Sequence, residues 1–146
     1  MKIKYAFIVS ISLWLVSCSN VYEQQYDNYA EYNKINPRPK SWFPQNIIFA
    51  DTYNLRSVSC LDSLSAFGEF SYSKQLLYDS IFNNNNVKHI SVDVYLQKIN
   101  RNKLNMPKWF HEPDINSTGR LETVNIDRFY IARDSLNKRI SFVLCN

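Results

Sequence analysis

Few side chains in this chain of 146 residues have the chemistry of a catalytic or metal-binding site. The two histidines are His89 and His111, and the second opens the motif His111-Glu112-Pro113-Asp114. A metal ion would need these side chains to converge, but adjacent side chains diverge and Pro113 restricts the backbone. The chain lacks the Gly-x-Ser-x-Gly motif, and its two glycines are too few for a phosphate-binding loop. We therefore predict no metal, no cofactor and no enzymatic activity. A hydrolase that uses paired carboxylates is the remaining enzymatic alternative.

The thiol of Cys18 lies at the end of an N-terminal segment of distinct composition. Lys2 and Lys4 precede the apolar run YAFIVSISLWLV at residues 5–16. As a helix this run would rise only about 18 Å, whereas the hydrocarbon core of a bilayer is about 30 Å thick. It is therefore typical of a secretion signal rather than of a transmembrane helix. The run ends in the sequence LVSC, which resembles a bacterial lipobox. In lipoproteins with this signal, the cysteine receives acyl chains such as palmitate and becomes the first residue of the mature protein.

The lipobox resemblance predicts how the chain is divided and where it resides. Residues 1–17 would be a lipoprotein signal peptide, residues 18–25 a membrane tether and residues 26–146 a single globular domain. Ser19 replaces the aspartate that favours retention in the inner membrane, which favours the outer membrane; whether the domain faces the periplasm or the exterior stays open. Cleavage would remove two of the 17 basic residues and leave 15 against 13 acidic ones. A nearly neutral, exported domain has no electrostatic basis for binding nucleic acid.

Lipidation of one of the three cysteines would leave Cys60 and Cys145 as a pair. In an oxidising compartment an even number of cysteines favours a disulfide. Such a bond would close a loop of roughly 85 residues, which the chain-entropy model associates with about 4–5 kcal/mol of stability. The alternative is two separately buried thiols, because the sequence does not supply the required geometry.

Two aromatic pairs next to proline are candidates for a binding surface. The sequences SWFP and PKWF contain Trp42 with Phe43 and Trp109 with Phe110, each in an expected loop. Exposed aromatic side chains dominate many binding interfaces, so these four residues could form a platform for a protein or a glycan. The interpretation that we favour is that Trp42 and Trp109 instead cover the core beneath long loops.

The pattern of apolar residues predicts an α+β domain with a small, mainly antiparallel sheet and one or two short helices. Tyrosines at helical spacing predict a helix within residues 22–35, and Ser73 is the expected N-cap of a second helix. Alternation of apolar and polar residues predicts strands, the last two forming a C-terminal hairpin. The remaining expected elements are strands at 67–73, 87–99, 121–133 and 138–145, a helix at 74–82 and a long loop at 100–119.

The middle of the chain contains four short motifs. They are Trp42 with Pro44, Asp62-Ser63, Gly68-Glu69-Phe70 and Pro107-Lys108-Trp109-Phe110. In this order they resemble motifs of small bacterial lipoproteins and exported proteins that are YbbD head-domain-like, over roughly residues 26–110. Ser41 stands where those proteins have glycine, and Ile48 stands where they have a second proline. The resemblance implies a small α+β domain of the cell envelope and no particular activity.

These observations predict a lipid-anchored envelope domain that is a non-enzymatic binding or structural module. Its expected partners are the membrane, through the N-terminal lipid, and a protein or a glycan. An inhibitor or immunity lipoprotein, which neutralises an envelope-acting toxin or a lytic enzyme, is the main alternative.

Overall fold

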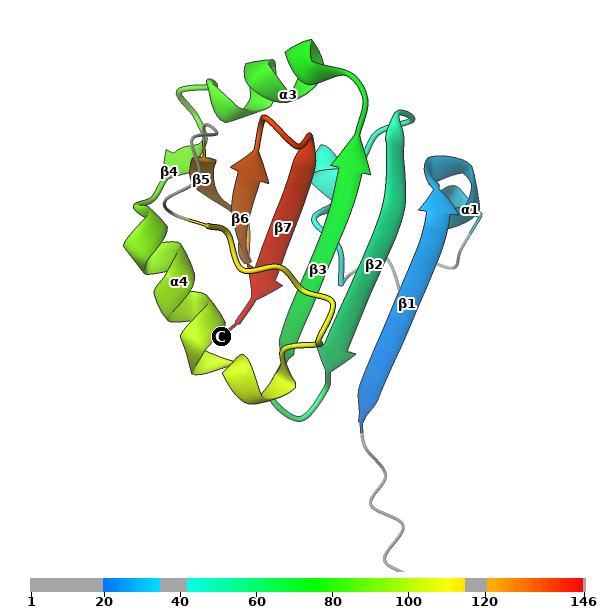
Figure 1. The fold of residues 1–146 in the computed structure, drawn as a ribbon, viewed down its shortest axis with the longest axis vertical. Coiled ribbons are helices and arrows are strands. Elements are labelled where there is room, and N and C mark those ends of the chain that lie inside the picture. The colour runs from blue at the N-terminus through cyan, green and yellow to red at the C-terminus, as the bar shows by residue number, and fades with distance from the viewer. Residues whose placement is uncertain (1–19, 35–41, 115–120, 146) are drawn as a thin grey trace, which may run out of the picture.

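The computed structural model of the chain describes residues 20–34, 42–114 and 121–145. Its centre is an antiparallel sheet of seven strands in the order β1-β2-β3-β7-β6-β5-β4 (Figure 1). The strands are β1 Val21–Asn28, β2 Thr52–Cys60, β3 Ser65–Tyr72, β4 Lys88–His89, β5 Leu121–Ile126, β6 Phe129–Asp134 and β7 Arg139–Leu144. The α-helices are α1 Tyr29–Asn33, α3 Gln75–Phe82 and α4 Val92–Arg101, and the 3-10 helices are η1 Gln45–Ile47 and η2 Lys103–Asn105. The α+β class, with a mainly antiparallel sheet, is confirmed.

The sheet has a hydrophobic cluster on each face. Residues of α1, η1 and α3 pack against one face, which we name the rear face. Residues of α4 and of the segment that follows η2 pack against the other, the front face. In Figure 1 the front face is turned toward the reader, with α4 and the segment that follows it lying over the sheet. Side chains alternate between the two faces along β3, where Phe67 belongs to the front cluster and Phe70 to the rear cluster.

Gly68 allows the closest contact inside the sheet. It lies opposite Phe142 of β7, and the Phe142 ring covers it on the rear face. A Cβ atom added at residue 68 would lie 2.1 Å from Cζ of that ring. The glycine is therefore required by close packing, and not by a positive φ angle.

A buried ion-pair network joins α3 to the sheet. Arg133 of β6 is 2% exposed. Its Nη2 donates to Asp79 of α3 at 2.7 Å and also pairs with Glu122 of β5, while its guanidinium lies over the ring of Phe82. A buried guanidinium needs such partners because its charge has left water.

The helix expected within residues 22–35 is largely wrong. Residues 21–28 form β1, and only Tyr29–Asn33 are helical. The regularly spaced tyrosines do not share a helix face. Tyr26 packs on the rear face from a strand, while Tyr29 and Tyr32 do so from α1, whose N-cap is Asn28. Residues 21–25, which were expected to belong to a membrane tether, instead lie in β1 of the sheet, and residues 18–19 lie outside the described residues.

The strand expected at 87–99 is also wrong over most of its length. Only Lys88–His89 are extended, and α4 occupies Val92–Arg101. The side chain of Ser91 caps the helix by accepting from the amide of Val94 at 3.3 Å. Tyr95 and Ile99, four residues apart, are the buried positions of this helix. The apolar residues of this segment fit both the strand and the helix periodicity. The Ser91 cap and the pair Tyr95 and Ile99, at i and i+4, favour the helix.

The other expected strands and the helix at 74–82 are confirmed with adjusted bounds. The loop expected at 100–119 begins later, because α4 extends to Arg101 and η2 occupies Lys103–Asn105, and its residues 115–119 lie outside the described residues. The strand at 121–133 is two strands, β5 and β6, joined by a turn in which Asp127 has a φ of 52°. β6 and β7 form the expected C-terminal hairpin. The helix expected at 74–82 is α3, but its N-cap is Lys74 rather than Ser73. The carboxylate of Asp51 accepts from the backbone amides of Ser73 and Lys74, at 3.1 and 2.8 Å, and so substitutes for a local cap.

Candidate functional site

Residues 106–114, which we name the strap, cross the front face of the sheet (Figure 1). Phe110 holds the strap in place by packing edge-on against Phe67 of β3, with 5.1 Å between ring centroids. Trp109 reaches the neighbouring strands, since its indole N–H donates to Glu23 of β1 at 3.0 Å. The guanidinium of Arg56 on β2 lies 4.4 Å from the centroid of the Trp109 ring and donates to the Trp109 carbonyl. The strap is therefore bound to three adjacent strands.

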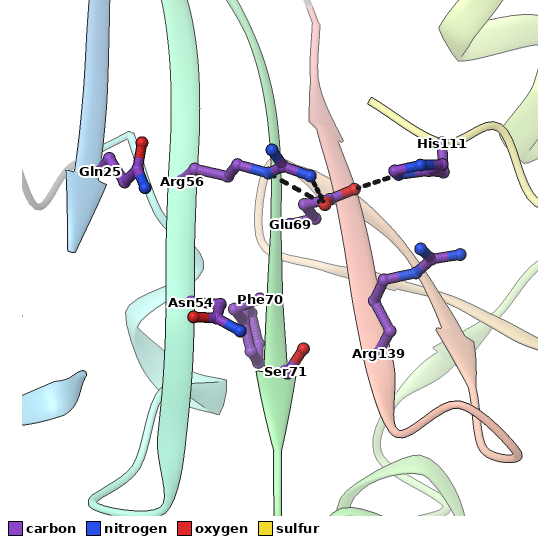
Figure 2. A pocket seen from close by; sticks show the side chains of 8 residues that line it. All are labelled: Gln25, Asn54, Arg56, Glu69, Phe70, Ser71, His111 and Arg139. Carbon is purple, nitrogen blue, oxygen red and sulfur yellow. Dashed lines mark hydrogen bonds and ion pairs between the residues drawn. The ribbon is translucent and has the colours of Figure 1, made fainter. Parts of the chain in front are cut away.

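Glu69, in the middle of β3, is the carboxylate around which the site is arranged (Figure 2). Its side chain is 7% exposed. Its Oε1 accepts from Nε of Arg56 at 3.0 Å and also from Nη2 of that residue. Its Oε2 lies 3.4 Å from Nδ1 of His111 on the strap. Because a buried carboxylate is costly without partners, these contacts make Glu69 the link between strap and sheet.

The pairing of Arg56 with Glu69 follows from strand register. The two residues lie directly opposite each other on β2 and β3. An irregularity interrupts this ladder between Tyr53 and Arg56, where Asn54 has a φ of 51°. Asparagine tolerates this left-handed conformation better than most residues, and β-bulges are frequent next to binding sites because they redirect side chains.

A hollow of about 370 Å³ lies beside the Arg56–Glu69–His111 cluster. Gln25, Asn54, Ser71 and Arg139 complete its polar lining, each from a different strand. Figure 2 shows the Arg139 side chain reaching from β7 toward the same space as His111. The guanidinium of Arg139 makes no hydrogen bond or ion pair with any other described residue. Its donors can therefore bind a ligand, while its charge also acts on Asp134, which lies opposite it on β6.

A second hollow of about 290 Å³ continues from the first, and His111 and Arg139 line both. This half is acidic, because Glu112, Asp114 and Asp134 line it. Partial burial would raise the pKa of Asp134, but hydrogen bonds from the following turn and the charge of Arg139 outweigh it and hold that pKa below its ordinary value. We name the two hollows together the front groove. It carries cations at one end and carboxylates at the other.

The front groove is suited to the recognition of polar groups. Arg139 offers a fork of donors, and His111, with 56% of its side chain exposed, offers a ring nitrogen that can donate or accept. The pairing of the partly exposed Arg56 with the buried Glu69 keeps both strap and strand in place, so the groove is preformed. An imidazole oriented by a carboxylate is also a component of general acid–base catalysis.

The aromatic platform expected from the two Trp-Phe pairs is not assembled. Phe43 is buried in the rear cluster with Trp42 packed against that cluster, whereas Phe110 is buried in the front cluster with Trp109 packed against it. The sheet separates the two pairs, so they cannot form a common surface. The packing of Trp42 and Trp109 against these clusters agrees with the expectation that the two tryptophans cover the core, and the phenylalanine next to each lies inside it.

The expected disulfide is not formed, because Cys60 and Cys145 are both free. Cys60 ends β2 and lies opposite Ser65 of β3, whose next residue lies opposite Leu144 at the end of β7. Strand β3 thus separates the two cysteines, which corresponds to a distance of about 10 Å and exceeds the ~7 Å limit for a disulfide. Hydrogen bonds from the turn after β2 lower the pKa of the Cys60 thiol, and burial raises that of Cys145.

The other residues singled out in the sequence contribute no further site. Cys18 lies outside the described residues. Within residues 20–34, 42–114 and 121–145, no group of three or more histidine, cysteine, aspartate or glutamate side chains could hold a metal ion. His89 is exposed on β4, where its backbone pairs with Val124. None of the helices in the described part of the chain is both long enough and apolar enough to span a bilayer.

The sequence did not point to Arg56 or Arg139, and it showed Glu69 only as part of the Gly68-Glu69-Phe70 motif and His111 only as a rejected metal ligand. A glutamate on a strand rich in aromatic residues was the available signal, since buried carboxylates are rare and need partners. The identity of those partners depends on strand register and on the path of the strap, neither of which is written in the local sequence.

Comparison with known proteins gives one family match, which covers about a third of the chain. The search of curated proteins found no match, and the search of solved structures also found none. Residues 20–71 match the model of the YbbD head domain. This segment contains β1, α1, β2 and β3, and thus includes Arg56, Glu69 and three of the four sequence motifs; the Pro107–Phe110 motif lies beyond it. The chain therefore resembles YbbD head-domain proteins, and its match to that domain covers residues 20–71.

Proposed function

We propose that the chain is a lipoprotein of the bacterial cell envelope that uses the front groove to bind a protein or glycan partner, without enzymatic activity. Its anchor is a set of acyl chains on Cys18, and its location is the outer membrane. The order of lysines, apolar run and LVSC sequence supports the anchor. The resemblance to the YbbD head domain agrees with an envelope role, because the family resemblance implies such a location.

The front groove is the observation that carries the binding role. Its side chains come from four strands and the strap, and the partly buried Arg56–Glu69 ion pair keeps them in position. Its charges are of both signs, with Arg139 between the basic and the acidic half. A complementary partner would present a carboxylate or another anionic group to Arg139 and donors to the acidic half. A uniformly anionic polymer such as nucleic acid would be repelled by that half.

Photo-crosslinking in cells tests the binding role. A photoreactive residue in place of Ser71, inside the groove, should yield a discrete adduct with a protein or a glycan. Arg139→Ala in the same chain should reduce the yield roughly tenfold, because charge-assisted hydrogen bonds are the strong ones. Lys138→Ala is the matched control: it removes the same charge one residue away, from a side chain that reaches Ser73 and does not line the groove. Adducts that do not depend on Arg139 would refute the groove as the binding site.

Substitution of the expected lipidation site tests the anchor. In the Cys18→Ser variant, acyl labelling should disappear and the chain should move from the membrane to the soluble fraction. Unchanged membrane fractionation together with absent labelling of the native chain would refute lipidation.

A further inference from the structure

One end of the sheet exposes apolar side chains from three separate segments. Leu61 and Leu64, in the turn between β2 and β3, are 41% and 50% exposed; Val21 at the start of β1 is 47% exposed; and Leu104 of η2 is fully exposed. We name these four residues the apolar tip. Figure 1 shows the β2–β3 turn, the start of β1 and the segment after α4 at the same end of the molecule.

The apolar tip is a single, ordered surface. Asn105 of η2 donates to the hydroxyl of Ser63 in the turn at 3.0 Å. An apolar hollow of about 260 Å³ lies between these segments, with Val21 and Leu104 in its lining. The tip therefore joins residues that are about 40 and 80 positions apart in the chain.

The conformation of the β2–β3 turn gives no reason for a leucine at position 64. Leu64 has a φ of 46°, a conformation that leucine rarely adopts and that glycine or asparagine would adopt at lower cost. A residue that is both strained and half exposed adds little to folding. Its side chain is better explained by something that covers it.

The N-terminal end of the described chain is attached to the tip. The carbonyl of Asn20 accepts from the amide of Leu61 at 3.0 Å, and the side chain of Asn20 donates to Asp62 at 2.7 Å. Cys18 is two residues before Asn20, and two residues span at most about 7 Å. If Cys18 carries the acyl chains, as the proposed function requires, the headgroups of the bilayer lie next to the apolar tip.

We infer that the apolar tip is a membrane-contact surface whose occupant is the lipid bilayer. Its leucines enter the interface beside the acyl chains of Cys18 and supplement the anchor by burying apolar area. Exposed basic residues, Arg101 at the end of α4 and Lys103 of η2, lie at the same end and suit anionic headgroups. Lys103 also forms an ion pair with Glu112 at 3.4 Å, and the carboxylate of Asp62 accepts a hydrogen bond from the side chain of Asn20. The inference rests on the proposed lipid anchor for the identity of the occupant.

Membrane contact at the tip would orient the domain. The strands run away from the tip, so α3 and the β6–β7 turn would be the parts most distant from the bilayer (Figure 1). The front groove, on one face of the sheet, would open sideways and remain accessible to a partner.

Photo-crosslinking to lipid tests the tip in the full chain, in membranes of the producing cell. A photoreactive residue replaces Leu61 or Leu104 in two chains, and Leu76 or Leu136 in two matched controls. The control leucines are 83% and 68% exposed, but lie on α3 and on the β6–β7 turn, at the opposite end. All four positions are exposed, so replacement leaves the core intact. We expect roughly tenfold more phospholipid adducts at the tip, because apolar insertion confines those side chains to the interface.

The outcomes separate this inference from the proposed function. Equal lipid adducts at both ends, or protein adducts in place of lipid at the tip, would overturn the membrane-contact surface even if Cys18 is acylated. The mass of the N-terminal peptide reports acylation independently. Absence of acyl chains would refute the anchor. The ratio of lipid adducts between the two ends would still show whether the apolar tip contacts the membrane.

Discussion

The rear face of the sheet packs a cluster of sixteen buried residues, whereas the front face packs six and leaves space for a polar groove. The rear cluster is rich in aromatic rings, with Phe142 at its centre in contact with Phe43, Phe70 and Phe129. The front face instead buries the carboxylate of Glu69 beside Arg56 and the strap. The difference shows how one sheet can take most of its stability from one face and present binding groups on the other.

The largest effect on the free energy of unfolding is expected from a substitution on the rear face. Phe142→Ala should lower the free energy of unfolding by about 3–5 kcal/mol, since it removes a fully buried ring from the larger cluster. Chemical denaturation measures this loss. Phe110→Ala on the front face is the comparison, and a smaller loss is expected because its cluster is smaller. An equal or greater loss for Phe110→Ala would contradict the unequal division of stability between the faces.

The close contact at Gly68 should give a smaller but specific effect. Gly68→Ala should cost about 1–3 kcal/mol, because the new methyl group overlaps the Phe142 ring. Combining it with Phe142→Leu, which vacates part of that space, should cost less than the sum of the two single variants in denaturation experiments. Strict additivity would show that the ring does not press on residue 68.

Alkaline pH should destabilise both faces through their buried tyrosines. Burial raises the pKa of Tyr32 from 10.0 to about 12. Burial also raises the pKa values of Tyr78 and Tyr95, and the hydrogen bonds of these tyrosines with Thr52 and Ser141 offset part of that rise. Above pH 10 the unfolded chain loses these protons first, so the free energy of unfolding falls as pH rises, by up to about 1.4 kcal/mol per pH unit for each tyrosine. Denaturation at a series of pH values measures the slope.

Tyr95→Phe is the variant that assigns part of this slope to the front face. It should make the slope shallower, because it removes the only one of the three tyrosines in the front cluster. An unchanged slope would mean that Tyr95 ionises as easily in the folded chain as in the unfolded one.

The smallest effect on stability is expected in the groove itself. His111→Ala should change the free energy of unfolding by less than about 0.5 kcal/mol, since more than half of this side chain is exposed. The same variant should reduce groove crosslinking, as measured with the photoreactive residue at position 71. A large loss of stability would contradict this prediction and show that the His111–Glu69 contact contributes strongly to holding the strap on the sheet.

The sequence correctly predicted the elements whose apolar pattern fits only a helix or only a strand. The strand around Gly68-Glu69-Phe70, the helix at Gln75–Phe82 and the C-terminal hairpin were found. The segments around Tyr22–Tyr32 and Val92–Ile99 were misassigned because their apolar residues fit both the helical and the strand period. In the first segment, pairing with β2 makes most of the residues a strand despite the helical spacing of the tyrosines. In the second, the Ser91 cap and the buried pair Tyr95 and Ile99 favour a helix.

The candidate site was predictable only in part. The sequence placed His111 beside Glu112 and Asp114, which line the same groove, but it did not reveal the contact of His111 with Glu69. The two Trp-Phe pairs were correctly identified as aromatic segments, but local sequence does not reveal that they pack on opposite faces of one sheet.

By itself, the sequence determined the α+β class, the resemblance to the YbbD head domain and the segments that form most of the strands. These properties depend on composition and on local periodicity, which neighbouring residues carry. Only the tertiary structure decided the seven-stranded order, the separation of Cys60 from Cys145, the groove around Glu69 and the apolar tip. Each of these depends on which strands pair and on where the strap crosses them, and such contacts between distant residues are set by the packing of the whole domain.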